Sequence, residues 1–181
     1  TGTLTQNKMT VAKCFVNLQM MDSDQLNPDR QKEFLEGMTL CNDGVCSDEE
    51  CIGEPTELAL LELSGKYHIR REQLEKAKPR TDEKPFDSKR KMMTTQHRQA
   101  GGYINYTKGA PDEVLKRCTK ILLDGREVRM TDVYRRQIEK ASERMSAQAL
   151  RVLAVSMKKD KKDLQEKDLT FIGLTGMIDP P

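Results

Sequence analysis

The stretch Tyr106-Thr107-Lys108-Gly109-Ala110-Pro111-Asp112-Glu113 joins a short β-run to a helix and guides the interpretation of the whole chain. Residues 103–107 are typical of a strand, whereas Pro111 suits the first position of a helix and two acids follow it at the positive end of the dipole. Lys108 therefore lies where a strand passes into a turn, beside a glycine without a side chain. A ligand could approach the backbone there next to a cation, although a solvated surface lysine is the commoner case.

Apolar runs and turn signals on both sides predict hairpins and separate helices. Strands are expected over residues 9–18, 85–86, 91–97, 103–107, 150–157 and 169–178, helices over 27–41, 53–65, 70–77, 111–118 and 131–145, a charged connector over 80–84 and a charged loop over 158–168. Asp124-Gly125 predicts a tight hairpin turn, and Thr131 an N-cap. The pattern favours an α+β fold, a largely antiparallel twisted sheet flanked by helices, over a doubly wound parallel sheet.

Composition restricts the class of function. The 181 residues are 36% hydrophobic and 33% charged, which fits one soluble domain with a core of its own. A formal net charge of +2 argues against nucleic acid as the main partner, and 4% aromatic residues without Trp argue against a base-stacking platform. No apolar run is long enough to span a bilayer.

The five cysteines form an odd number, which excludes a complete disulfide framework and indicates a reducing, cytosolic compartment. Cys41, Cys46 and Cys51 are evenly spaced, but the spacing is not that of a C-x-x-C knuckle and no histidine is near them. A zinc site there is the less favoured interpretation.

Familiar phosphate-binding and catalytic signatures are missing from the sequence. Gly65-Lys66 lacks the upstream glycine of a Walker loop, and Tyr67 follows it where Ser or Thr is needed. No G-x-G-x-x-G and no catalytic Ser-His or Cys-His arrangement occurs. A nucleotide would have to bind without a phosphate-cradling loop.

Three side chains could serve a ligand, although each also has an ordinary structural interpretation. Arg151 interrupts an apolar run, so it either pairs with an anion or points to solvent. Phe86 precedes the cations of 89–91 and could stack on a base while they meet phosphates, or it could belong to the core. Glu57 lies in the first turn of a helix, where a carboxylate favours the dipole.

Six short motifs give these residues a common context. In order they are Thr1-Gly2-Thr3-Leu4-Thr5, Gly53-Glu54-Pro55-Thr56-Glu57, Phe86 with Arg90-Lys91-Met92-Met93, Lys108-Gly109-Ala110-Pro111, Leu150-Arg151-Val152-Leu153-Ala154 and Gly176-Met177-Ile178-Asp179-Pro180-Pro181. The series resembles the nucleotide-binding domain of P-type cation-transporting ATPases over essentially the whole chain. The opening resembles the end of that family's Asp-Lys-Thr-Gly-Thr-Leu-Thr motif, and residues 85–93 are most similar to calcium pumps of the secretory-pathway and bacterial kind.

The resemblance implies a nucleotide-binding site made of Thr56, Glu57, Phe86, Lys91, Lys108, Gly109 and Arg151. Phe86 would stack on the adenine. Glu57 would lie near the adenine amino group, with Thr56 beside it. Lys108 would form the wall by the base, and Gly109 would leave room for the ligand to approach.

The resemblance also implies roles at the phosphates and at the hinge. Lys91 and Arg151 would face the phosphates of ATP, and Thr1 would help hold Mg²⁺ and the terminal phosphate in the whole pump. Asp179 and Pro180 would form the return hinge, so both chain ends would lie close together.

The sequence departs from the family pattern in three places. The phosphorylated aspartate and its lysine would lie immediately before Thr1 and are missing from the 181 residues, so the fragment alone is expected to be catalytically inactive. Ser88 stands where muscle-type calcium pumps carry an arginine, so the phosphate contacts would come from Lys91 and Arg151, or from Arg90. Asp112 stands where many relatives carry Glu, a change expected to be mild.

Residues 1–8 are expected to be a stub of the phosphorylation domain, 9–172 the nucleotide-binding domain and 173–181 the return hinge. The predicted function is to bind ATP in the cytoplasm and present its γ-phosphate to an aspartate of the adjoining phosphorylation domain in a multi-pass membrane pump. Calcium is the predicted cargo, and the phosphorylation and actuator domains are the expected partners. The alternatives are a pump for another cation and an interaction module that binds no nucleotide.

Overall fold

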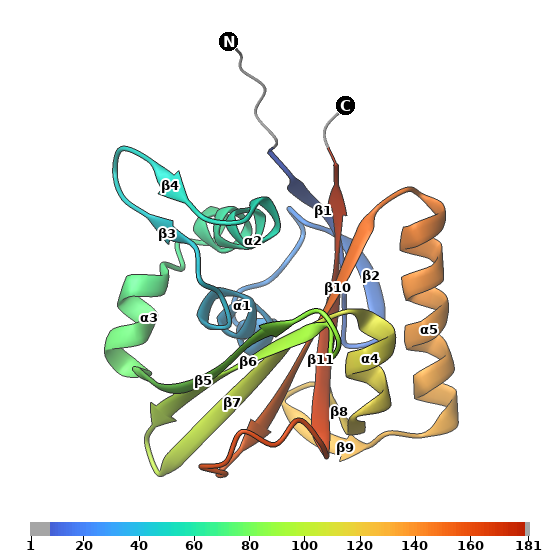
Figure 1. Ribbon diagram of the computed structural model, residues 1–181. Coiled ribbons are helices and arrows are strands. Elements are labelled where there is room, and N and C mark those ends of the chain that lie inside the picture. Colours follow the sequence, from blue (N-terminus) through green and yellow to red (C-terminus); the bar gives the residue numbers. More distant parts are fainter. Residues whose placement is uncertain (1–7, 180–181) are drawn as a thin grey trace.

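A twisted, largely antiparallel sheet forms the centre of the molecule (Figure 1). The computed structural model describes residues 8–179, and within them nine strands form this sheet. Its strands are β1 (Thr10–Val16), β2 (Gln19–Asp22), β5 (Arg80–Asp87), β6 (Met92–Gln99), β7 (Gly102–Gly109), β8 (Cys118–Leu123), β9 (Arg126–Arg129), β10 (Arg151–Lys159) and β11 (Leu169–Ile178). Their order is β2-β1-β11-β10-β7-β6-β5, with β8 joined in parallel to β11 and β9 paired to β8. The predicted α+β fold is confirmed.

Five helices cover the two faces of this sheet, again within residues 8–179. They are α1 (Lys32–Leu40), α2 (Pro55–Lys66), α3 (Arg71–Ala77), α4 (Pro111–Lys116) and α5 (Asp132–Ala147). Figure 1 shows α1, α2 and α3 on one side and α4 and α5 on the other. A small two-stranded sheet, β3 (Val45–Cys46) with β4 (Cys51–Ile52), precedes α2.

The core consists of two hydrophobic clusters separated by the sheet. Phe34 of α1 and Leu60 of α2 belong to one cluster, and Ile138 of α5 belongs to the other. Successive residues of β10 divide between them, since Val155 packs into the first and Ala154 into the second. This division follows from the alternation of side chains along a strand and explains why β10 and β11 are apolar on both faces.

Local signals placed several elements correctly. Asp124 and Gly125 have φ angles of 49° and 80°, as a tight hairpin turn requires. The Thr131 hydroxyl accepts a hydrogen bond from the Tyr134 N–H at 3.1 Å and caps α5. The strand predicted over 169–178 matches β11 at both ends.

Two predictions are wrong. Residues 80–84 are not a connector but the first half of β5, an edge strand paired with β6. Their charges misled the prediction because an exposed edge strand tolerates charged side chains. The first helix begins at Lys32 rather than Asn27, because the Asn27 side chain accepts hydrogen bonds from the N–H groups of Asp29 and Arg30 and so closes a preceding turn.

The described chain begins and ends on neighbouring strands, since Thr10 of β1 pairs with Ile178 of β11. The boundary predicted at residue 173 lies inside β11, where Gly173 pairs with both Val16 and Val155. The predictions for Thr1 and Pro180 fall outside the described residues. No helix in 8–179 is both long and apolar enough to cross a membrane.

Candidate functional site

A cavity of about 690 Å³ opens where the first turn of α2 meets strands of the sheet. It is lined by Met9, Glu54, Pro55, Thr56, Glu57, Phe86, Met93, Lys108, Gly109, Arg151, Leu153 and Asp179. The volume is within the range of small-molecule sites. Six of the seven predicted nucleotide-binding residues lie here, together with the predicted hinge residue Asp179. Lys91 is not among the described residues that line the cavity.

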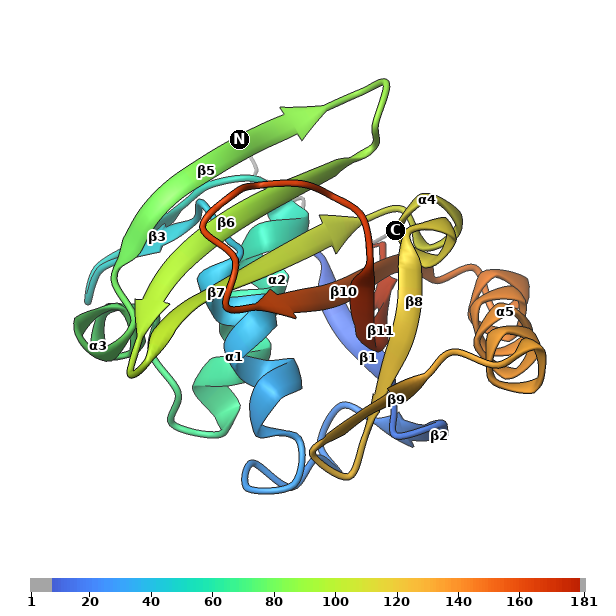
Figure 2. The same cartoon turned by 90° about the horizontal axis from the view of Figure 1, so that it is seen from below.

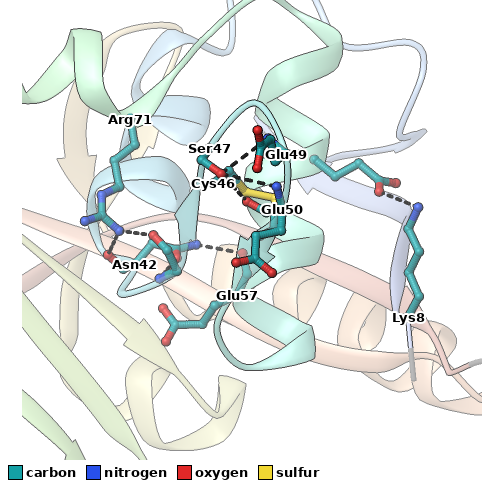
Figure 3. Close-up of a disulfide and its surroundings, with 11 residues drawn as sticks. Lys8, Asn42, Cys46, Ser47, Glu49, Glu50, Glu57 and Arg71 are labelled. Carbon is teal, nitrogen blue, oxygen red and sulfur yellow. Dashed lines mark hydrogen bonds and ion pairs between the residues drawn. A yellow bond between two sulfur atoms is a disulfide. The ribbon is translucent and has the colours of Figure 1, made fainter. Parts of the chain in front are cut away.

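The first turn of α2 forms one wall of the cavity. Gly53, with a φ of 154°, turns the chain from β4 into the helix, and Pro55 occupies its first position. The α1–α2 loop holds this turn in place, because the Asn42 side chain donates a hydrogen bond to the Glu57 carbonyl at 2.9 Å. Arg71 in turn donates to the Asn42 carbonyl at 3.0 Å (Figure 3). Thr56 and Glu57 are therefore presented from a braced helix end.

Lys108 and Glu57 form an ion pair at the cavity wall, with Nζ 3.1 Å from Oε2. The lysine side chain is 5% exposed and the glutamate side chain 15%, so water solvates neither charge well. The same carboxylate oxygen accepts a hydrogen bond from the Asp43 N–H at 2.7 Å. A buried ammonium is tolerable only with such a partner. Lys108 is thus neither the solvated lysine considered above nor a free cation.

Gly109 has a different reason to be glycine from the predicted one. A Cβ atom at this position would collide with the Lys91 carbonyl and lie 2.7 Å from Met92 Cα, both in the backbone of the neighbouring segment. The close approach of β6 therefore requires the glycine, whereas room for a ligand was the expected reason. Gly109 nevertheless lines the cavity.

Phe86 and Arg151 face the cavity from separate strands and keep their functional groups accessible. Phe86 of β5 is 62% exposed, so its ring is not a core residue. Arg151, the first residue of β10, is exposed and forms no ion pair with any residue of 8–179. The core interpretation of Phe86 is therefore wrong, whereas Arg151 points to solvent, one of the two alternatives expected for it.

Comparison with known proteins agrees with this geometry. Residues 30–181 match the family model described as P-type ATPase, cytoplasmic domain N. The chain belongs to this family. Over its whole length this N domain is 44% identical to Calcium-transporting ATPase 1 of Bacillus cereus, 41% to Calcium-transporting ATPase 1 of Lactococcus lactis and 32% to human Calcium-transporting ATPase type 2C member 1. It spans 21%, 22% and 21% of those relatives, respectively. The resemblance found in the motifs is confirmed.

Several residues of the N domain site were missed from sequence. Glu54, Met93 and Leu153 lie inside quoted motifs and could have been included, but Met9 carries no chemical signal and reaches the cavity only through the fold. Met9 and Met93 give the cavity an apolar, largely buried lining, since Met9 is 5% exposed and Met93 6%. An apolar surface with a few polar groups is typical of a ligand site.

Lys91 and Arg90 lie in the turn between β5 and β6. Lys91 adopts a left-handed conformation with a φ of 60°, and its carbonyl accepts a hydrogen bond from the Ala110 N–H at 3.0 Å. Arg90 donates from Nε to Glu166 at 2.7 Å. The guanidinium of Arg90 is therefore engaged within the domain, which disfavours the alternative that it contacts phosphates.

The cysteines of the N domain do not form a metal site. Cys46 and Cys51 form a disulfide that closes the β3–β4 hairpin (Figure 3), a pair not expected from the odd cysteine count and the predicted reducing compartment. Cys41 is fully buried elsewhere, its thiol donates to the Tyr106 carbonyl at 3.4 Å, and burial raises its pKa. No group of three or more His, Cys, Asp or Glu in 8–179 could hold a metal ion. The structure thus gives the zinc interpretation no support.

Proposed function

We propose that this N domain binds ATP in the cavity beside α2 and presents the γ-phosphate to an aspartate of an adjoining phosphorylation domain in a calcium pump. The observation that carries the proposal is the convergence of residues 56–57, 86, 108–109 and 151 on one cavity. These segments are far apart in sequence, and the motifs had already predicted each of them as part of a nucleotide site. The family description and the relatives named calcium-transporting ATPases support the same assignment.

The chemistry of the lining suits an adenine nucleotide. The exposed ring of Phe86 offers a face for stacking, and Met93 and Leu153 supply apolar contacts to a base. Glu57 uses Oε2 for Lys108 and Asp43, so its other carboxylate oxygen is the one proposed to accept from the adenine amino group. Thr56 lies beside it on the same turn.

The phosphates are proposed to meet the accessible guanidinium of Arg151, with Lys91 reaching them from the β5–β6 turn. Mg²⁺ would arrive with the phosphates, because the residues of 8–179 offer no cluster to hold it; Thr1 is its proposed contact in the pump. Asp179 lines the cavity where the chain leaves β11, so a nucleotide there would lie next to the proposed hinge of Asp179 and Pro180.

In the parent pump the proposed role is positioning and electrostatic stabilisation of phosphoryl transfer. Residues 1–8 and 173–181 would connect this domain, 9–172, to the phosphorylation domain. The actuator domain and a multi-pass membrane part would complete the pump, with this domain on the cytoplasmic side. The isolated chain is expected to bind ATP without hydrolysing it.

Titration of the isotope-labelled chain with ATP, followed by NMR, tests the proposal. Amide shifts are expected around the cavity, and Phe86→Ala should weaken binding by about 5- to 150-fold, the equivalent of one lost base–aromatic contact. Val133 of α5 is 60% exposed and does not line the cavity, so Val133→Ala is the matched control and should leave the affinity unchanged. Absence of shifts at millimolar ATP would refute nucleotide binding and favour an interaction module.

A further inference from the structure

The segment between β10 and β11 carries a buried carboxylate that the site described above does not use. Figure 2 shows this segment passing across β6 and β7. The side chain of Asn105 in β7 holds it, donating to the Asp163 carbonyl at 2.7 Å, and Arg117 donates to the Glu166 carbonyl at 3.2 Å. Glu166 is only 5% exposed and does not line the cavity.

The Glu166 carboxylate contacts both strands of the β5–β6 hairpin. Its Oε1 accepts from Arg90 Nε at 2.7 Å, and its Oε2 accepts from the Thr94 hydroxyl at 2.6 Å. Lys84 of β5 is more distant, with Nζ 3.6 Å from Oε1, and is 43% exposed. Burial opposes ionisation of Glu166, but the hydrogen bonds from Arg90 and Thr94 outweigh it and lower the pKa of this carboxyl.

Arg90 connects the Glu166 carboxylate to both sides of the β5–β6 turn. Its Nη2 donates to the Pro85 carbonyl and to the Met92 carbonyl, each at 3.1 Å. Pro85 immediately precedes Phe86, the exposed aromatic residue at the cavity. One guanidinium therefore links Glu166 to the peptide unit that carries the Phe86 nitrogen.

This link matters because the ladder between β5 and β6 is interrupted at the same point. The pairing shifts register between Lys84 and Asp87, so Pro85 and Phe86 have no assigned partner on β6 among the described residues. Phe86 is 62% exposed, so packing against other side chains does little to hold its ring in place. Its position depends on the turn, which is closed by a hydrogen bond from the Lys91 N–H to the Asp87 carbonyl at 2.6 Å and is fastened to Glu166 through Arg90.

We propose that Glu166 is a positioning residue for the nucleotide site: through Arg90 it holds the β5–β6 turn so that the Phe86 ring faces the cavity. The inference rests on the proposed function, and it extends the site to a segment that touches no part of the cavity. It also gives Arg90 a role that requires its planar fork, since Nε and Nη2 both donate to the Glu166 carboxylate while Nη2 also reaches the Pro85 and Met92 carbonyls.

The test is a double-mutant cycle in the 181-residue chain. Glu166→Gln should weaken ATP binding by about five- to tenfold, a part of the stacking contribution of Phe86. In a Phe86→Ala background the same substitution should change the affinity by less than about twofold, because no ring remains to be positioned. Lys84→Gln is the matched control: it removes the distant, exposed contact to the same carboxylate and should have little effect.

Two further measurements separate positioning from a general loss of stability. Without nucleotide, Glu166→Gln should increase the amide hydrogen-exchange rates of residues 86–91 relative to the unaltered chain. The rates in β10 and β11 should increase less. Arg90→Lys keeps a charge beside Glu166 but loses the guanidinium that donates to the Pro85 and Met92 carbonyls. It should therefore cause a similar loss of ATP affinity, and it takes the place of Glu166→Gln if that variant does not fold.

Equal losses of affinity with and without the Phe86 ring, or no loss in the unaltered background, would overturn the positioning role. Failure of the unaltered chain to bind ATP would instead refute the proposed function, and with it any nucleotide role of Glu166. The exchange rates of 86–91 would then show separately whether the turn is held by Arg90.

Discussion

Lys108→Met gives the sharpest test of the site's electrostatics. The substitution keeps an unbranched chain of similar length and removes the ammonium that lies 3.1 Å from Glu57 Oε2. Lys108 is 5% exposed, so no water can replace it freely, and the Glu57 carboxylate would keep only the Asp43 N–H at 2.7 Å. The folded state is therefore left with a poorly compensated charge.

The expected loss follows from two opposing contributions. At an effective dielectric constant of about 20, two unit charges about 3 Å apart attract by about 5 kcal/mol. Desolvation of both groups offsets part of this attraction, and removing one partner of a buried pair costs about 3–5 kcal/mol in free energy of unfolding. Because Glu57 retains one N–H donor, we expect about 3 kcal/mol for Lys108→Met and a similar loss for Glu57→Gln.

Urea unfolding of the two single variants and the double variant measures the coupling between these side chains. The double variant should lose about 2–3 kcal/mol less than the sum of the single losses, because it contains neither unpaired charge. Lys116→Met is the control: its ammonium lies 3.0 Å from Glu113 but is 68% exposed, so the loss should stay below about 1 kcal/mol. Additive losses for Lys108 and Glu57 would refute the pairing.

Three further predictions concern stability. Burial lowers the pKa of His97 from 6.5 to about 4, so the unfolded chain binds the extra proton between these pH values and stability falls as pH decreases, by about 3 kcal/mol at pH 4. His97→Gln should flatten this slope in urea unfolding at pH 7 and pH 4. Gly109→Ala should cost at least about 2 kcal/mol through collision with β6, whereas Gly65→Ala, with nothing within 4 Å, should stabilise α2 by about 0.5–1 kcal/mol in thermal unfolding. Reduction of the Cys46–Cys51 disulfide, checked by thiol labelling, should cost at most about 2 kcal/mol because the loop is short, and should leave ATP affinity unchanged because neither cysteine lines the cavity.

The sequence by itself determined the elements whose signals are local. Asp124-Gly125 specified a hairpin through its φ angles, and Thr131 specified a helix start through one hydroxyl acceptor. The apolar run of 169–178 specified a buried strand because both of its faces need apolar partners. Such rules need only a few neighbouring residues, so they can be applied without the fold.

The motifs also predicted most of the cavity lining, but through resemblance rather than physical argument. Taken one at a time, Glu57, Phe86 and Arg151 had ordinary structural interpretations, and no local rule chose between these and a ligand site. Their convergence on a single cavity became visible only when the strands and α2 were assembled.

Tertiary structure alone decided the features that depend on contacts across the sheet. Glu57 and Lys108 are 51 residues apart and meet because the fold brings the first turn of α2 and β7 to the same cavity wall. Gly109 is glycine because β6 lies against it, and residues 80–84 form a strand because β6 offers them an unpaired edge. Lys108 shows the difference most clearly: its sequence context is that of a surface lysine, whereas burial beside a carboxylate makes it part of the cavity wall. Burial and pairing arise from distant segments, and a local pattern contains no information about them.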